Sequence, residues 1–247
     1  MLKKYILLLL LPVAAFAQEE PIETDRPDQT ETAAIVPKGM FQAETGFSHK
    51  KTAPHDSEFE LPETLWKFGL NNRLELRLMT TVLYSKAADS AAFGLEPVTV
   101  GLKVNLWEEN GMLPETSLIV HMKLPKAASK KFEAQYLPPE IRLLFQNEIN
   151  DNIDLGYNLG VSWDGQTAEP EYAYTFSPDF KMTDKASAYI ESFGYIPDAK
   201  HADHWIDGGF KYLITKNVQI DLSGGYELSS HQKHHKYFES IGFSFRI

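Results

Sequence analysis

Residues 98–107, VTVGLKVNLW, alternate between two faces with a period of two. Successive side chains of a β-strand point to opposite sides, whereas a helix repeats about every 3.6 residues. The stretch therefore predicts a strand with one apolar and one mostly polar face. The apolar face holds Val98, Val100, Leu102, Val104 and Leu106, and the other holds Thr99, Gly101, Lys103, Asn105 and Trp107.

The same alternation recurs from residue 39 to the C-terminus. It is clear in 152–163 and 217–226, and in all it predicts about twelve strands. Most are about as long as the roughly 9–11 residues that a tilted strand needs to cross a bilayer. The predicted strands lie near 39–49, 60–70, 73–84, 97–107, 115–125, 139–149, 152–163, 170–177, 185–195, 204–213, 217–227 and 237–247.

The connections between these strands fall into two groups. Those after odd-numbered strands are long, for example 50–59, 85–96 and 126–138, whereas most of those after even-numbered strands are short, for example 71–72 and 150–151. An even number of strands with tight turns at one end and long loops at the other is typical of a bacterial outer-membrane barrel. We therefore predict an all-β fold, an antiparallel transmembrane β-barrel.

Composition narrows the class further. The chain has 247 residues, a net charge of −10, no cysteine and a mean hydropathy of −0.31. The absence of cysteine excludes a disulfide scaffold and a thiol nucleophile. Nucleic acid is not expected as a partner, because phosphate binding needs a clustered Lys/Arg surface that this sequence lacks.

The first 38 residues differ from the rest. Lys3 and Lys4 precede an apolar stretch, and Ala15-Phe16-Ala17 has the small-x-small form of a signal peptidase site, so residues 1–17 read as a signal peptide. Residues 18–38 carry many acids and threonines, with no apolar periodicity, and predict an extended N-terminal arm at the periplasmic side. The barrel would then comprise residues 39–247.

The polar face of the predicted strands carries ionisable groups of both signs. Facing a dry core they would be costly unless paired, so we expect them to line a wet lumen while the apolar face meets lipid. An exported soluble β-barrel or β-sandwich that binds a ligand, with this face in solvent, is the alternative. The lumen-lining candidates are Glu44, Lys67, Glu75, Arg77, Lys103, Lys123, Glu140, Arg142, Asp154, Asp207, Lys211, Asp221 and Arg246.

The last predicted strand favours the membrane barrel. Ile241, Phe243, Phe245 and Ile247 alternate with small or polar residues up to the end of the sequence. A terminal amphipathic strand rich in aromatics is the form that the outer-membrane assembly machinery reads. We therefore expect that machinery and the lipid bilayer as partners; an ordinary final strand of a sandwich is the alternative.

Several stretches resemble a known family. They are IETDRPDQTET at 22–32, VPKG at 36–39, QAETGF at 42–47, GLNNRLELR at 69–77, DGGF at 207–210 and DLSGG at 221–225. With these residues the chain is similar to the outer-membrane transporters grouped as "MetA-pathway of phenol degradation" proteins. The resemblance covers essentially the whole mature chain and implies an outer-membrane barrel with an uptake role. It supplies no catalytic or ligand residues.

The arm is the first candidate for a functional segment. Asp25-Arg26-Pro27-Asp28 places a guanidinium between two carboxylates beside a stiff proline, which could latch the arm onto opposite charges in the lumen or at its periplasmic mouth. The hypothesis is a plug or constriction. A solvated leader that ties down the first strand is the alternative.

Histidines gather in the predicted loops at one rim. His201-x-Asp203-His204 and His231-x-x-His234-His235 could offer imidazole and carboxylate to zinc, copper or nickel. Loop histidines are usually only solvated, which is the competing interpretation.

No nucleophile elbow, zincin, phosphate-loop or dinucleotide motif is present in the sequence, so neither an enzyme nor a cofactor is expected. We predict an outer-membrane channel for passive uptake of a small solute, aromatic or otherwise organic. A barrel with a purely structural or adhesive role is an alternative within the same fold.

Overall fold

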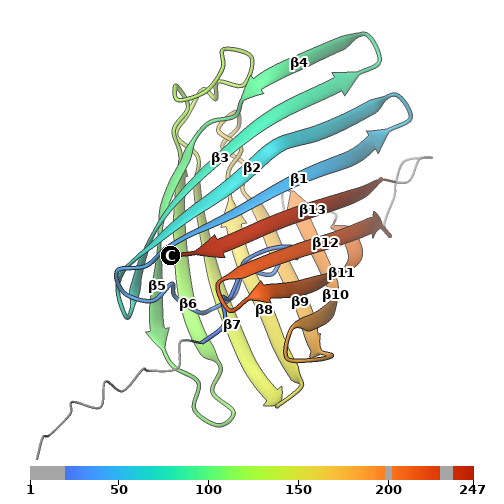
Figure 1. Cartoon of the computed structure of the whole chain (residues 1–247). Coiled ribbons are helices and arrows are strands. Elements are labelled where there is room, and N and C mark those ends of the chain that lie inside the picture. The colour runs from blue at the N-terminus through green and yellow to red at the C-terminus, as the bar shows by residue number, and fades with distance from the viewer. Residues whose placement is uncertain (1–19, 198–201, 229–235) are drawn as a thin grey trace, which may run out of the picture.

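The computed structural model describes residues 20–197, 202–228 and 236–247 (Figure 1). The predicted signal peptide lies outside these residues. The described chain is all-β and forms one antiparallel sheet. Its strands are β1 (Phe41–Ala53), β2 (Asp56–Asn71), β3 (Leu74–Ala87), β4 (Ser90–Leu95), β5 (Thr99–Trp107), β6 (Glu115–Lys123), β7 (Pro139–Asn150), β8 (Ile153–Ser162), β9 (Glu171–Lys181), β10 (Ala186–Pro197), β11 (Asp203–Thr215), β12 (Val218–Glu227) and β13 (Tyr237–Arg246).

The sheet closes on itself. β1 pairs with both β2 and β13, and β2 also pairs with β3, so twelve strands form a complete ring. Closure leaves no unpaired edge within the twelve-stranded ring, which is what a membrane requires of a β-structure. The predicted twelve-stranded antiparallel barrel is therefore confirmed. β4 is an addition that pairs only with the outer half of β3.

The sequence predicted long loops at 50–59 and 85–96, and both predictions are wrong. β1 and β2 continue pairing to Ala53 and Asp56, so their connection is a tight turn, and the end of β3 together with β4 occupies most of 85–96. Beyond the bilayer a strand no longer needs an apolar face. In 48–60 and 85–92 charged, polar and small residues replace the alternation, while the backbone ladder continues.

Both ends of the barrel domain lie at the rim with the short turns. Ile247 exchanges two backbone hydrogen bonds of 2.8 Å with Phe41, and Lys38 bridges to Gly69 beside the β2–β3 turn. In outer-membrane barrels the short turns face the periplasm. The rim that carries β4 and the connection 126–138 is therefore extracellular.

The burial pattern shows which face meets lipid. Phe210, Leu222 and Ile241 are direct neighbours on β11, β12 and β13, and all are more than half exposed. In contrast, Glu75 and Lys103, a cross-strand pair on β3 and β5, are fully buried. A soluble barrel or sandwich needs the opposite arrangement, so that alternative is wrong. The described part of the chain contains no helix that could cross a membrane.

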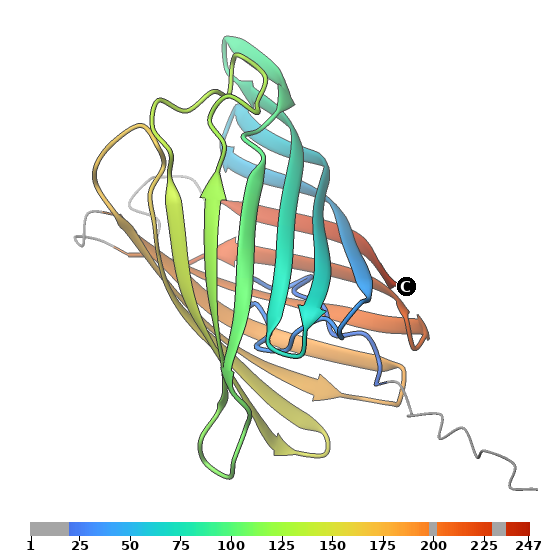
Figure 2. The same ribbon diagram turned by 90° about the vertical axis from the view of Figure 1, so that its left-hand side faces the viewer.

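Residues 20–38 run inside the barrel as an irregular arm. Figure 2 shows this segment, in dark blue, behind the strands of the near wall. It enters and leaves at the periplasmic side, because Ile22 donates to the carbonyl of Lys216 in the β11–β12 turn and Gly39 to that of Gly69. The arm therefore enters the lumen from the periplasmic rim, turns back inside the barrel and returns to the same rim.

The outward position of Leu222 predicts the effect of a charge there. Leu222→Arg would place a guanidinium against acyl chains near mid-strand, and should lower the free energy of unfolding from lipid vesicles by about 2–4 kcal/mol. Met112→Arg, in the fully exposed β5–β6 turn, is the control and should change it by no more than about 0.5 kcal/mol. Equal effects of the two substitutions in urea titrations would contradict a lipid-facing β12.

Candidate functional site

The arm crosses the lumen from wall to wall. Among the described residues, the arm forms hydrogen bonds or ion pairs with side chains of eleven of the twelve barrel strands, on all sides of the ring. Such contacts require the arm to lie inside the barrel rather than against one wall. The contacting strands are β1, β2, β3, β5, β6, β7, β8, β9, β10, β12 and β13.

Asp25 is the centre of this network. Its carboxylate accepts from Lys67 Nζ at 2.8 Å, Arg77 Nη1 at 3.0 Å and Lys103 Nζ at 3.2 Å, and we call these four residues the latch. The three cations come from the neighbouring strands β2, β3 and β5, where Lys67 and Arg77 are directly paired. Each of these side chains is at most 4% exposed. Buried charges of this kind are stable only when each has its counterion.

The surroundings of Asp25 keep it ionised. Burial alone would raise the pKa of this carboxyl, but the charges of Lys103, Lys67 and Arg77 hold it well below its usual range. Glu44 adds a second anchor, because its carboxylate accepts from the backbone amides of Asp25 at 2.8 Å and Arg26 at 3.1 Å. The carboxylate of the latch is therefore charged throughout the neutral pH range.

Arg26 fixes the arm to β12 and β13, which lie on the other side of β1 from the strands that carry the latch cations. Its Nη2 donates to Asp221 at 3.2 Å and to Ser240 at 2.7 Å. Gly46 and Gly242 face each other across β1 and β13, and a Cβ on either would collide with the Arg26 side chain. Glycine at these two positions allows the Arg26 guanidinium to lie directly on the strand backbone.

The far end of the arm loop is held by Glu31 and its neighbours. Glu31 pairs with Arg77 at 2.5 Å, and Arg142 lies 3.8 Å from it. Thr30 donates to Glu191 at 2.6 Å, and Asp28 accepts from Ser177 at 3.0 Å. Burial raises the pKa of Asp28 to about 6, although Lys211 opposes the shift.

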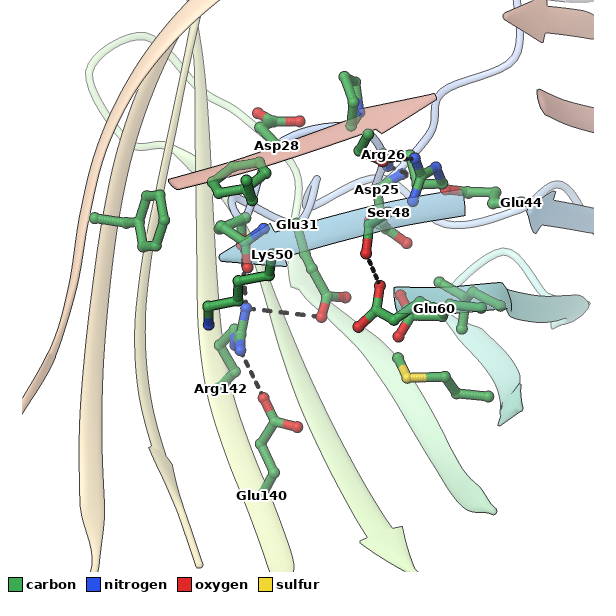
Figure 3. Close-up of a pocket in the computed structure, with 18 of the residues that line it drawn as sticks. Asp25, Arg26, Asp28, Glu31, Glu44, Ser48, Lys50, Glu60, Glu140 and Arg142 are labelled. Atoms are coloured by element: carbon green, nitrogen blue, oxygen red, sulfur yellow. Dashed lines mark hydrogen bonds and ion pairs between the residues drawn. The ribbon is translucent and has the colours of Figure 1, made fainter. Parts of the chain in front are cut away.

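Cavities lie on both sides of the arm. The extracellular one has a volume of about 370 Å³, with arm residues 25–31 as its floor, and Figure 3 shows the charged groups around it. The periplasmic one, of about 230 Å³, lies between the two ends of the arm at 20–23 and 34–37. The arm therefore separates an outer vestibule from an inner mouth.

Most predicted lumen residues do meet the arm. Of the others, Glu140 pairs with Arg142, Asp207 with Tyr189 and Lys211 with Asp179. Lys123 and Asp154 are exposed near the ends of their strands and join none of these contacts. Those that contact the arm directly are Glu44, Lys67, Glu75, Arg77, Lys103, Arg142, Asp221 and Arg246.

The histidine hypothesis stays a prediction. His201, His231, His234 and His235 lie outside the described residues. His204 Nδ1 makes a hydrogen bond with the Tyr174 hydroxyl. Within the described ranges no group of three or more His, Cys, Asp or Glu side chains could hold a metal ion.

Sequence reasoning missed the aromatic side of the vestibule. Phe193 and Tyr195 share the lumen face of β10 with Glu191. Trp205 is an even number of positions from Asp207 and Lys211, and so is Phe238 from Arg246. Each therefore lies on the same face of its strand as a predicted lumen residue, and this spacing could have identified both aromatic residues. These aromatic residues were missed because large apolar side chains were expected to face lipid.

Removing the Asp25 charge should destabilise the barrel. Asp25→Asn leaves Lys67, Arg77 and Lys103 with less compensating charge, and should cost about 3–5 kcal/mol of unfolding free energy in vesicles. It should also expose the Glu31–Thr32 bond of the arm to a glutamyl endopeptidase. Glu23→Gln, at an exposed arm position, is the matched control and should change neither readout. Wild-type stability and protection in the Asp25→Asn variant would contradict the latch.

Asp28 predicts a pH dependence of stability. An acid whose pKa rises from 3.8 when unfolded to about 6 when folded favours the native state at low pH. Relative to Asp28→Asn, the wild type should therefore lose stability between about pH 4 and pH 6, by up to about 3 kcal/mol, and show no further change above pH 7. Paired urea titrations at each pH measure this difference, and a difference that is constant with pH would contradict it.

Solved structures with a similar fold include channels and a porin. The COG4313 outer membrane channel from Pseudomonas putida F1 has a TM-score of 0.64 and 11% identity, covering 91% of this chain and all of that one. The NanC porin has a TM-score of 0.60 and 8% identity, over 83% and 100% of the two chains. The monoaromatic hydrocarbon channel CymD has a TM-score of 0.50 and 8% identity, over 86% and 89%. At these identities the likeness establishes the fold alone.

Comparison with curated protein sequences finds no match. The family model described as "Putative MetA-pathway of phenol degradation" matches residues 24–247, which include the arm from Thr24 and the whole barrel. The closed, lipid-exposed barrel locates the protein in the bacterial outer membrane. The chain belongs to the "MetA-pathway of phenol degradation" family of outer-membrane β-barrel proteins, as the resemblance in its sequence implied.

Proposed function

We propose that the protein is a passive outer-membrane channel for a small organic solute, and that residues 20–38 form its constriction. One observation carries the proposal: a polar lumen contains a cavity on each side of a single arm. A barrel with only a structural role has no need of a cavity on each side of an internal arm. Transport is also favoured over catalysis because the solved barrels of similar fold are channels and porins.

The arrangement supports selection by size and charge. A solute that enters from outside reaches the vestibule, whose volume of about 370 Å³ is at the small end of ordinary ligand sites. To continue, it must pass the arm, where Asp25, Arg26 and Glu31 present charge of both signs. Polar side chains on the wall can replace part of the hydration shell of a small solute during this passage.

Two alternatives describe how the arm acts. As a static constriction it leaves a narrow path beside itself, and as a gate it moves aside. The many contacts of the arm with the wall favour the static form, since displacement would break several buried ion pairs at once. We also propose that β13 carries the signal for the outer-membrane assembly machinery, because its outward residues Ile241, Phe243 and Phe245 form an aromatic and aliphatic run at the end of the strand.

Liposome swelling tests the channel, and the arm can be tested in the same assay. Liposomes with the mature protein should swell in small sugars and aromatic acids, at rates that fall with solute size. A protein lacking residues 18–36 should swell them several-fold faster and admit larger solutes. No swelling above protein-free liposomes would contradict the channel, and identical rates with and without the arm would contradict the constriction.

An engineered disulfide separates the static arm from the moving one. The hydroxyls of Thr30 and Thr175 are 2.7 Å apart, and the chain has no cysteine to interfere. Oxidised Thr30→Cys/Thr175→Cys protein should swell liposomes as fast as the reduced form if the arm is static. Slower swelling that a reductant restores would show instead that passage requires the arm to move.

A further inference from the structure

One wall of the vestibule is aromatic. Phe193 stacks on Trp205, with ring centroids 5.9 Å apart and planes 11° from parallel, and Phe238 and Tyr195 extend the surface at 6.1 Å and 5.9 Å. These rings come from β10, β11 and β13 and face the lumen, away from the lipid. Aromatic side chains in a polar pore offer a flat apolar surface and an electron-rich face to a ligand.

The wall already holds one cation. The Lys50 ammonium lies over the Trp205 ring, 5.3 Å from its centroid, and covers it. Lys50 forms no ion pair within the described residues. Its side chain is long and flexible, so a ligand cation can displace it at little conformational cost. The contact between the Lys50 ammonium and the Trp205 ring is therefore of the kind that a ligand cation would make.

The β2 side of the vestibule is acidic. Glu58, Glu60 and Glu63 all line the cavity, because a shift of the β1–β2 and β2–β3 register between Glu60 and Glu63 turns both onto the lumen side. Glu60 accepts from Ser48 at 2.6 Å and Glu63 from Thr81 at 3.2 Å. Figure 3 shows the Glu60 contact with Ser48.

These carboxylates have no ion-pair partner in the part of the chain that the structure describes, where no cation lies within 4.0 Å of Glu58, Glu60 or Glu63. The arginines of the cavity are already engaged elsewhere. They pair as Arg26 with Asp221, Arg77 with Asp25 and Arg142 with Glu140. A concave site with walls of low dielectric constant focuses such charge and raises the local concentration of cations.

We propose that the vestibule binds an organic cation with an aromatic or similarly flat apolar body. The ring would lie on the Trp205 and Phe193 surface in place of the Lys50 side chain, and the charged end would lie toward Glu58, Glu60 and Glu63. The proposal rests on the channel function above and names its solute class. A neutral aromatic compound gains only the ring contact, and an aromatic anion meets carboxylates that repel it.

Calorimetric titration of the mature protein in non-ionic detergent micelles tests the ligand class, with protein-free micelles as the blank. Three probes share a ring: 2-phenylethylammonium, 2-phenylethanol and 3-phenylpropanoate, and n-butylammonium supplies the charge without it. The phenylethylammonium ion should bind at least about tenfold more tightly than any of the others. Equal affinities, or tighter binding of the neutral or anionic probe, would overturn the proposal.

Variants of the vestibule assign the preference to its two walls. Glu58→Gln/Glu60→Gln/Glu63→Gln should reduce the advantage of phenylethylammonium over phenylethanol to less than about threefold, whereas Trp205→Leu should weaken both probes. Asp151→Asn, in the exposed β7–β8 turn, removes a carboxylate at the other end and should leave the preference intact. Far-ultraviolet circular dichroism and heat-modifiable gel mobility verify that each variant is folded. A preference that survives the triple substitution would overturn the site.

Planar bilayers separate this inference from the channel proposal. One experiment places phenylethylammonium chloride on one side of the bilayer, and a parallel experiment uses sodium phenylpropanoate in the same way. The two reversal potentials should show preferential passage of the aromatic cation. Tight binding without any channel current would refute the channel and leave the site standing. Current without preference for the aromatic cation would refute the site and leave the channel standing.

Discussion

The structure depends on the carboxylate of Asp25, which is shared by three cations. Lys67, Arg77 and Lys103 project from neighbouring strands into a lumen that lipid surrounds, where an uncompensated charge would be very unfavourable. Asp25 comes from the arm and not from the wall, although Glu44 and Glu75 on the wall also contact two of these cations. The arm therefore supplies part of the charge balance of the barrel, and the barrel in turn holds an arm that has no regular secondary structure of its own.

This arrangement replaces the hydrophobic core of a soluble protein with a polar one. Where the arm meets β6 and β7, the buried apolar side chains form only a small cluster of Ala33, Ile119 and Leu144. Apart from this cluster and the aromatic wall of the vestibule, the described interior consists mainly of ion pairs and hydrogen bonds, many of them between arm and wall. Apolar burial still drives folding, but the apolar surface is buried in lipid, so the interior is free to carry charge that can select solutes.

Much of this arrangement could be predicted from the sequence. Alternation at period two located all twelve barrel strands, and the parity of Lys67, Arg77 and Lys103 placed them on the polar face. β4 and the extracellular ends of β1 and β2 were missed, because strands outside the bilayer carry no apolar face to mark them. The aromatic wall was missed for a related reason: Phe193 and Trp205 look lipid-facing when only hydrophobicity is considered, although their parity with Glu191 and Asp207 indicates the lumen.

The sequence by itself determined the twelve barrel strands, most of the short turns at one rim and the two faces of most strands, because these depend on neighbours one or two residues apart. Only the tertiary structure decided which carboxylate meets which cation. Asp25 lies 42 positions from Lys67 and 78 from Lys103, and no local pattern reports a contact over that distance. The path of the arm inside the lumen brings Asp25 to these cations, and the closure of the ring between β1 and β13 joins an aromatic and an acidic wall around one vestibule.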